Sequence, residues 1–147
     1  MVLLLLALAG CATPQTERLL ETAPAFPRPV ELTAVPFFPQ EAYQCGPAAL
    51  ATVLNHAGLN VTPEELAPQV YLPERHGSLQ FELLAAARRH GRVPYVLRPQ
   101  LETLVTEVAS GHPVLVLQNL GFAAIPKWHY AVVVGFDLSR AEVVLRS

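Results

Sequence analysis

The sequence PQEAYQCGPAAL, residues 39–50, places Cys45 at the start of an expected helix. Apolar residues follow at helical spacing, and Gly58 supplies a C-terminal stop. Pro47 falls in the first turn, where the missing N–H of proline costs no hydrogen bond. The pattern therefore predicts a helix over residues 45–57 with the thiol of Cys45 at its N-terminus.

Two roles are open to Cys45 at this position. Cysteine is commonly buried in proteins as a small hydrophobic residue. A thiolate is instead a nucleophile, and a helix N-terminus favours that ionised form. The free backbone N–H groups of the first turn would also stabilise an oxyanion on an attacked carbonyl. Position alone leaves both roles open.

The bulk composition fits one packed domain and excludes several classes of partner. The chain has 147 residues, of which 52% are hydrophobic and 15% charged. A net charge of −2 without any run of Lys or Arg argues against a nucleic-acid partner. With two cysteines and no histidine pair at ligand spacing, we expect no zinc site and no other cofactor.

Residues 1–11, MVLLLLALAGC, form an apolar run that ends in small residues and Cys11. A bilayer-spanning helix needs about 20 apolar residues, so this run is too short to span and suits a secretory signal. Its end resembles the bacterial lipoprotein signal, in which the cysteine is lipidated. The pattern predicts a protein anchored in the bacterial cell envelope, facing the periplasm or the exterior. No Lys or Arg precedes the run, which departs from that pattern, and a buried apolar helix is the alternative.

Residues 12–32 are predicted to form a proline-rich tether that lifts the domain off the membrane. An isolated helical turn over residues 16–22 is compatible with this segment. We expect the domain to begin at residue 33 and to run to residue 147 or beyond it. If Cys11 carries lipid, Cys45 has no partner for a disulfide.

The remaining elements follow from periodicity and capping residues. Thr62, Pro63 and Glu65 suit N-cap, N1 and N3 of one helix, and Ser78 is expected to cap another helix that ends at Gly91. A further helix is expected over residues 100–109. Strands are expected over residues 32–38, 93–97, 113–117, 128–136 and 142–146, the last two joined by a turn at 137–140. Helices followed by a sheet predict an α+β fold with segregated layers.

A candidate base for Cys45 comes from the histidines. The chain has five: His56, His76, His90, His112 and His129. His129 opens the expected strand WHYAVVVGF, so alternation places His129, Ala131, Val133 and Gly135 on one face. A polar ring at the end of an apolar face calls for a partner. The alternative is a structural histidine whose hydrogen bonds are satisfied.

These two segments together resemble a known family. Gln40 and the run CGPAAL of residues 45–50, followed much later by HYAVVVG of residues 129–135, are similar to the bacteriocin-processing papain-like cysteine peptidases, cysteine-peptidase family thirty-nine. The narrower resemblance is to a stand-alone, lipoprotein-anchored branch that often carries helical repeats after the peptidase domain. The resemblance covers about residue 35 to the end of the chain. It implies a papain-like fold, with the helix of Cys45 packed on a C-terminal antiparallel sheet.

The resemblance also implies roles for individual residues. Cys45 would be the nucleophile, His129 the general base and then acid, and Gln40 a side-chain donor to the oxyanion hole. Gln40 lies five residues before the cysteine, where family members often have six, and Gln44 is the alternative. The substrate would be a peptide or protein. Transporter-fused members cleave glycine-ended leader peptides, but nothing in this sequence encodes a transporter.

The residue that orients His129 is not evident. Asp137 shares its face, but eight strand residues separate the two by roughly 26 Å, whereas an orienting hydrogen bond spans about 3 Å. Antiparallel pairing places the partner near Ser147 or beyond the end of the sequence. Asn119, which follows a strand, is a further candidate.

Three other interpretations stay open. A degenerate domain of the same fold would bind an extended peptide without cleaving it. A thiol acyltransferase or amidase would use the same cysteine. An envelope scaffold would bind a protein partner through helical repeats in a downstream segment.

Overall fold

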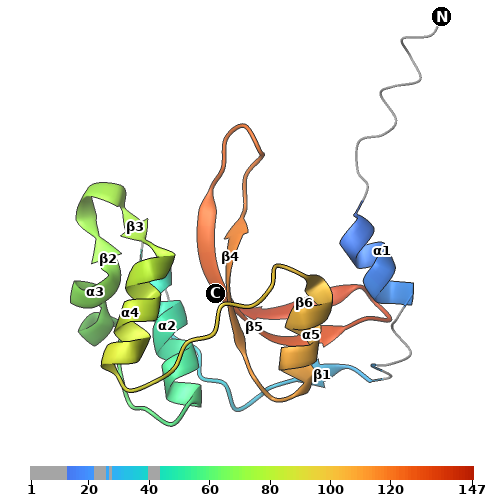
Figure 1. The fold of residues 1–147 in the computed structure, drawn as a ribbon, viewed down its shortest axis with the longest axis horizontal. Helices are drawn as coiled ribbons and strands as arrows, with labels where there is room; N and C mark the ends of the chain where they lie inside the picture. Colours follow the sequence, from blue (N-terminus) through green and yellow to red (C-terminus); the bar gives the residue numbers. More distant parts are fainter. Residues whose placement is uncertain (1–12, 22–25, 27, 40–43) are drawn as a thin grey trace, which may run out of the picture.

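A four-stranded antiparallel sheet forms the centre of the described part of the chain (Figure 1). The computed structural model describes residues 13–21, 26, 28–39 and 44–147. The long strand β5 (Trp128–Asp137) is the centre of this sheet. β4 (Val114–Asn119) pairs with its first half, β6 (Glu142–Arg146) with its second half, and β1 (Val30–Glu31) with Phe136 and Gly135.

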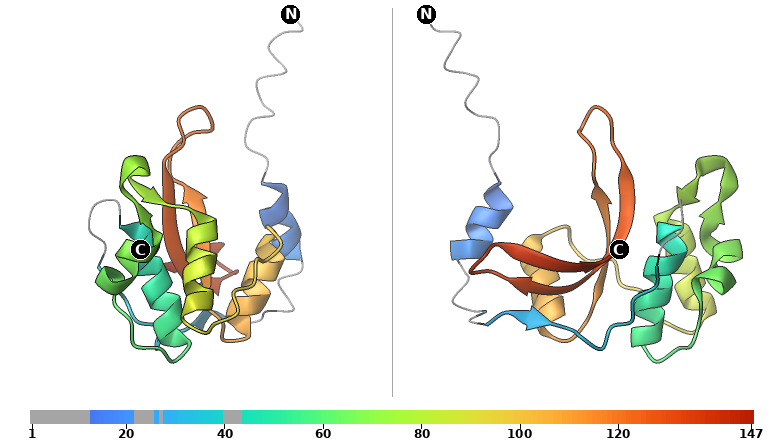
Figure 2. Two further views of the ribbon diagram at one scale, coloured as in Figure 1. Left: turned by 60° about the vertical axis from the view of Figure 1, so that its left-hand side comes forward. Right: turned by 180° about the vertical axis from the view of Figure 1, so that it is seen from behind.

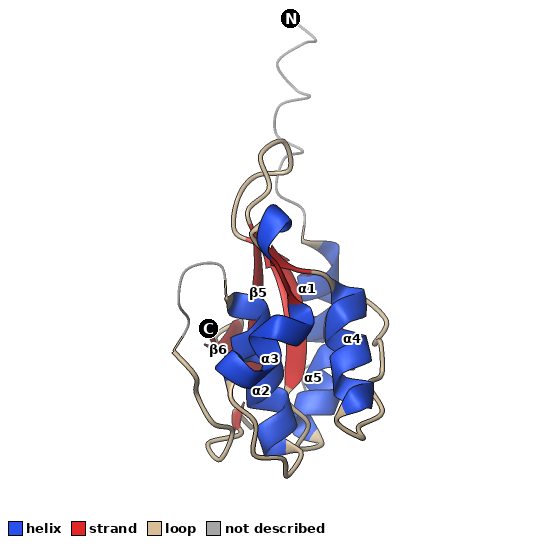
Figure 3. Cartoon of the chain, turned by 90° about the vertical axis from the view of Figure 1, so that its left-hand side faces the viewer, coloured by secondary structure: helices blue, strands red, loops and turns tan. Residues whose placement is uncertain are grey.

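Helices cover both faces of this sheet. α2 (Cys45–His56), α3 (Pro63–Val70) and α4 (Gln80–Arg89) lie on one face (Figure 3). α5 (Leu101–Ala109) and α1 (Pro14–Glu21) lie on the other, as both views of Figure 2 show. A small hairpin of β2 (Tyr71–Leu72) and β3 (Gly77–Ser78), joined by a 3₁₀ turn at Pro73–Arg75, connects α3 to α4. The fold is α+β as predicted, although the helices are not segregated to one side.

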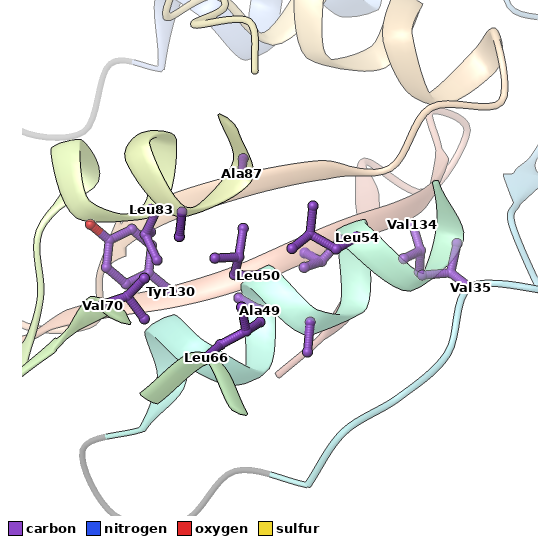
Figure 4. Packing of buried hydrophobic residues seen from close by; sticks show 13 residues of the cluster. Val35, Ala49, Leu50, Leu54, Leu66, Val70, Leu83, Ala87, Tyr130 and Val134 are labelled. Carbon is purple, nitrogen blue, oxygen red and sulfur yellow. The ribbon is translucent and has the colours of Figure 1, made fainter. Parts of the chain in front are cut away.

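Each face of β5 supports its own hydrophobic core. Tyr130, Val132 and Val134 face α2, α3 and α4 in the α2-side core (Figure 4). The buried members of this core are Val35, Ala49, Leu50, Ala51, Leu54, Leu66, Val70, Leu83, Ala86, Ala87, Tyr130, Val132 and Val134. The α5-side core comprises Leu19, Val105, Val108, Val133 and Phe136. Since β5 is buried on both faces, it reads as a continuous apolar run.

A β-bulge changes which face the end of β5 presents. The pairing with β6 shifts between Val133 and Gly135. As a result Val134 contributes to the α2-side core and Phe136 to the α5-side core, although strict alternation would place both on one face. Alternation therefore holds for the start of the strand and fails at Gly135. A Cβ at Gly135 would collide with the carbonyl of Val30, so glycine is what allows β1 to approach here.

Several predicted elements are confirmed. α2 begins at Cys45 and ends one residue earlier than expected, and Gly58 beyond it has a φ of +84°. At α3, Thr62 and Glu65 form a complete capping box: the Thr62 N–H donates to Glu65 Oε2 at 2.8 Å, and the Glu65 N–H to Thr62 Oγ1 at 3.3 Å. α5 and the hairpin of β5 and β6 also lie where periodicity places them.

Two predicted strands are wrong. The first strand lies at Val30–Glu31 rather than over residues 32–38. The chain turns after Leu32, whose carbonyl accepts a hydrogen bond from the Val35 N–H. Residues 93–97 form no strand, and Val93, Tyr95 and Val96 are exposed. In both segments prolines remove backbone donors that a sheet would need.

Ser78 does not cap α4, which corrects a further prediction. It lies in β3 paired with Tyr71, and Leu79 occupies the N-cap. The Ser78 side chain instead presses on Gly46, in the first turn of α2, where a Cβ would come 2.5 Å from the Ser78 Cβ. Ser78 Oγ is buried there without a hydrogen-bond partner among the described residues. The glycine after Cys45 is thus what allows β3 to seat against α2.

The segment expected as a tether contains a helix that packs on the domain. Leu19 of α1 is buried in the α5-side core. The Gln15 side chain accepts a hydrogen bond of 3.0 Å from the Leu101 N–H and donates to the Pro99 carbonyl at 3.4 Å. It thereby satisfies a backbone donor at the start of α5. α1 differs from the isolated turn expected for residues 16–22, because an amphipathic helix is stabilised by the apolar face on which it packs.

We predict that Gly46→Ala destabilises the domain by about 1–3 kcal/mol, the usual cost of overpacking. The new methyl group must displace the Ser78 side chain, with which it would overlap. Urea unfolding measures the loss. In a Ser78→Gly background, Gly46→Ala should lower the free energy of unfolding much less, because the colliding side chain is gone. A Gly46→Ala variant as stable as the parent chain would refute this contact.

Candidate active site

Cys45 is the first residue of α2, and its thiol is free and half-buried. Gln44 at the N-cap makes no side-chain hydrogen bond to the first turn. The Ala48 N–H is bonded to the Gln44 carbonyl at 3.2 Å, so the N–H groups of Cys45 and Gly46 belong to the open end of the helix. A nucleophile placed here lies in the positive field of the helix and beside backbone donors suited to an oxyanion.

His129 is the second residue of β5 and is half-buried. Among the described residues, its ring forms no hydrogen bond. Three other histidine rings are engaged elsewhere: His56 with the Gly111 carbonyl, His90 with Gln69, and His112 with Glu107. Each of these three rings has one nitrogen in a hydrogen bond, whereas both ring nitrogens of His129 can still accept or donate one.

Tyr130 links the start of α2 to the start of β5. Burial is the main cause that raises its pKa, and the negative charge of the Cys45 thiolate raises it further. The thiol therefore lies within electrostatic reach of the residue that follows His129 in β5. Cys45 also packs against the α2-side core, which contains Tyr130. The Cys45 thiol thus lies near Tyr130 on the α2 side of β5, whereas regular alternation over this part of the strand points the His129 side chain to the face of Val133.

Gln118 is a polar neighbour of His129 that the sequence analysis missed. It is paired with His129 in the β4–β5 ladder. Residues opposite each other in an antiparallel pair point to the same face, with Cβ atoms about 5 Å apart. Only the register of the hairpin, which depends on the loop between β4 and β5, brings the two together. A count of residues along one strand could not have found it.

The candidates for orienting His129 are placed as follows. Asp137 lies at the far end of β5, where its carboxylate accepts hydrogen bonds from the hydroxyl and the N–H of Ser139. These bonds, chiefly the one from the hydroxyl, lower the pKa of the Asp137 carboxyl. This confirms its interpretation as a turn residue.

The other two candidates, Asn119 and Ser147, also lie in the described part of the chain and form no hydrogen bond with His129. The Asn119 side chain accepts hydrogen bonds from the Gly121 and Lys127 N–H groups and so closes a loop instead. The pairing of β5 with β6 ends at Val132↔Arg146. Ser147 therefore follows the last paired residue and lies short of the position opposite His129.

Gln40 and Cys11 lie outside the described residues, so their predicted roles stay predictions. Within the described residues, no group of His, Cys, Asp and Glu side chains is arranged to hold a metal ion. A shallow hollow around Val30, Phe136 and Val144 lies at the other end of β5 from His129 and contains neither thiol nor imidazole. It is therefore not a candidate for the chemistry of Cys45.

We predict that Cys45→Ala lowers the pH at which Tyr130 ionises. A raised pKa means that folding favours the protonated phenol. Its contribution to stability is complete below the unfolded value of 10.0 and is lost as pH rises through the higher value of the folded state. Removing the thiolate removes one cause of that shift. Tyrosinate absorbance during an alkaline titration measures it, with Tyr130→Phe identifying which of the four tyrosines is responsible. An unchanged titration in Cys45→Ala would show that the charge of Cys45 does not act on Tyr130.

Comparison with known proteins supplies the family. A "Peptidase_C39 like family" matches residues 32–146, a range that includes both Cys45 and His129. The chain is also 32% identical over 96 residues to a protein of Methanothermobacter thermautotrophicus that is described as uncharacterized. That match covers 65% of this chain and 60% of the archaeal protein. No solved structure shows a significant match. The match over residues 32–146 shows that the chain belongs to the C39-like peptidase family.

Proposed function

We propose that this protein is a cysteine peptidase of papain-like fold, with Cys45 as nucleophile and His129 as general base and then acid. The observation that carries the proposal is the family match over residues 32–146. Within that match, a free thiol opens the uncapped helix α2, and this helix packs on the strand that begins at Trp128. The proposed substrate is a peptide or protein, and no cofactor takes part.

The first half of the reaction forms a thioester. His129 removes the thiol proton, and the Cys45 sulfur attacks the carbonyl carbon of the scissile peptide. The oxyanion receives hydrogen bonds from the Cys45 N–H and from the Gln40 side chain. The C–N bond then breaks, and the imidazolium of His129 donates its proton to the leaving amine.

The second half restores the enzyme. A water molecule takes the place of the leaving amine and gives a proton to His129 as its oxygen attacks the thioester carbonyl. The C–S bond breaks, the new carboxyl group leaves, and the proton returns to the Cys45 sulfur. Gln118, the cross-strand neighbour of His129, would hold the ring during these transfers.

We further propose that the protein belongs to the stand-alone, lipoprotein-anchored branch. Residues 1–11 would be the signal that ends in the lipidated Cys11. Residues 12–32 would connect it to the peptidase domain of residues 33–147 and, through α1 and β1, also pack on that domain. The apolar run before Cys11 supports this assignment. The anchor would place the domain on a bacterial envelope membrane, facing the periplasm or the exterior.

We predict that Cys45 is alkylated at lower pH than a model thiol and that His129→Ala abolishes this advantage. The full chain carrying Cys11→Ser is suitable, because Cys45 is then its one remaining cysteine. The rate of iodoacetamide modification is measured against pH, and its half-maximal point is compared between variants. His112→Ala is the matched control, since that ring is exposed and bonded to Glu107. Its profile should equal that of the parent.

Outcomes of this titration separate the proposed enzyme from its alternatives. A profile equal to that of a model thiol in every variant would contradict the nucleophile and favour a degenerate peptide-binding domain. A reactive thiol that releases products from an activated ester by transfer to amines, rather than to water, would indicate an acyltransferase. Hydrolysis of a peptide library that requires both Cys45 and His129 supports the peptidase.

A further inference from the structure

The loop between β4 and β5, together with the strand ends that flank it, carries a concentrated group of exposed apolar side chains. We call Leu117, Leu120, Phe122, Ile125 and Trp128 the hairpin tip. All five are exposed, with 82% of Phe122 and 76% of Ile125 accessible to solvent. Figure 1 shows this loop standing clear of the rest of the molecule. Apolar groups gathered on a projecting element mark a contact with another phase or molecule.

The backbone of this loop is largely closed on itself. The Leu120 N–H donates to the Lys127 carbonyl at 2.8 Å, and Phe122 and Ile125 exchange bonds of 3.2 and 3.1 Å. The Asn119 side chain accepts from the Gly121 and Lys127 N–H groups at 2.9 and 2.8 Å. Groups already paired inside the hairpin cost little to remove from water. An extended peptide, which binds by main-chain hydrogen bonds, would find few free donors in this loop.

The polar residues of the loop suit a lipid surface. Lys127 is the one charged residue in the sequence from 113 to 128, and it lies beside Trp128. Tryptophan and lysine are the residues that favour the level of lipid headgroups, with the indole in the interface and the ammonium in water. Phenylalanine and isoleucine at the end of the loop favour the adjacent acyl region.

The described end of the chain lies on the same side of the molecule as this loop. The N-terminal end of α1 and the hairpin tip both face upward in Figure 1 and in both views of Figure 2. Gln15 and Leu19 hold α1 on the domain. A lipid on Cys11 would be attached within about 7 Å of Thr13 along the chain. The anchor would therefore hold this side of the domain against the membrane.

We propose that the hairpin tip docks on a lipid membrane, with Phe122 and Ile125 inserted among the lipids and Trp128 and Lys127 at the headgroups. The contact is interfacial, and none of the described helices is long and apolar enough to cross a membrane. The proposal rests on the proposed function only for the lipid on Cys11. The tip itself is independent of Cys45 chemistry.

Trp128 provides a direct probe, because it is the one tryptophan of the chain. The full chain with Cys11→Ser, which cannot be lipidated, is mixed with vesicles of phosphatidylethanolamine and phosphatidylglycerol. We expect a blue shift of the Trp128 emission and its quenching by brominated acyl chains. Phe122→Asp should lower vesicle partitioning roughly tenfold or more, because a charge replaces a side chain whose burial is favourable.

Phe81→Asp is the matched control. Phe81 is an aromatic residue with 79% exposure at the start of α4, and it lies outside the hairpin. Partitioning of this variant should equal that of the parent, and so should that of Cys45→Ala. Since the apolar leader is present in every variant, its own affinity for vesicles cancels in the comparison.

Two outcomes would overturn the proposal. One is a Trp128 emission that vesicles leave unchanged. The other is equal loss of partitioning in Phe122→Asp and Phe81→Asp. A blue shift of the Trp128 emission that a peptide substrate causes and vesicles do not would instead show that the hairpin tip binds substrate. Failure of Cys45 alkylation alone would remove the proposed peptidase and leave the membrane contact standing.

Discussion

Burial of β5 on both faces is the constraint on which the rest of the structure depends. A strand with water on one side needs one apolar face, whereas β5 needs two. Val132 and Val133 therefore point into different cores, and helices must cover both sides of the sheet. α2 meets this requirement on one face and α5 on the other. The position of Cys45 near Tyr130 is a consequence, because α2 buries part of its apolar side by packing along this strand.

The bulge in β5 lets one strand meet two different requirements. Its first half follows strict alternation. His129 therefore lies opposite Gln118 in β4, and Tyr130 points into the α2-side core. Its second half is shifted by the extra residue, which turns Phe136 toward α5 and onto Phe26 at a ring-centroid distance of 5.9 Å. The strand that carries the candidate base is thus anchored at its far end by a different core.

Local signals in the sequence predict the elements that are defined by their own residues. The capping box of Thr62 and Glu65 and the helix that begins at Cys45 needed no knowledge of distant contacts, and both are confirmed. The prediction for Ser78 is wrong because a serine before an apolar run suits a helix N-cap as well as it suits a strand. Only the contact with Gly46, which is distant in the sequence, distinguishes the two. Residues 93–97 have the composition of a strand, but a strand also requires a neighbouring strand with free backbone donors and acceptors.

The same distinction applies to the candidate site. Sequence motifs single out Cys45 and His129, and a distance estimate along the strand removes Asp137. Gln118 and the loop-closing role of Asn119 depend on the register of β4 against β5, which is a property of the pair and not of either segment.

The pairing of β1 with β5 has a consequence for how the chain is made. Val30 lies opposite Phe136, so a segment at the start of the domain pairs with one that is synthesised much later. Until Phe136 is available, α1 and β1 lack the strand that completes the α5-side core, and α2 lacks the strand on which it packs. Closure of such distant contacts is slow compared with helix formation. The domain can therefore assume its final form only after β5 has been synthesised, and the apolar side of α2 must be kept from other partners until then.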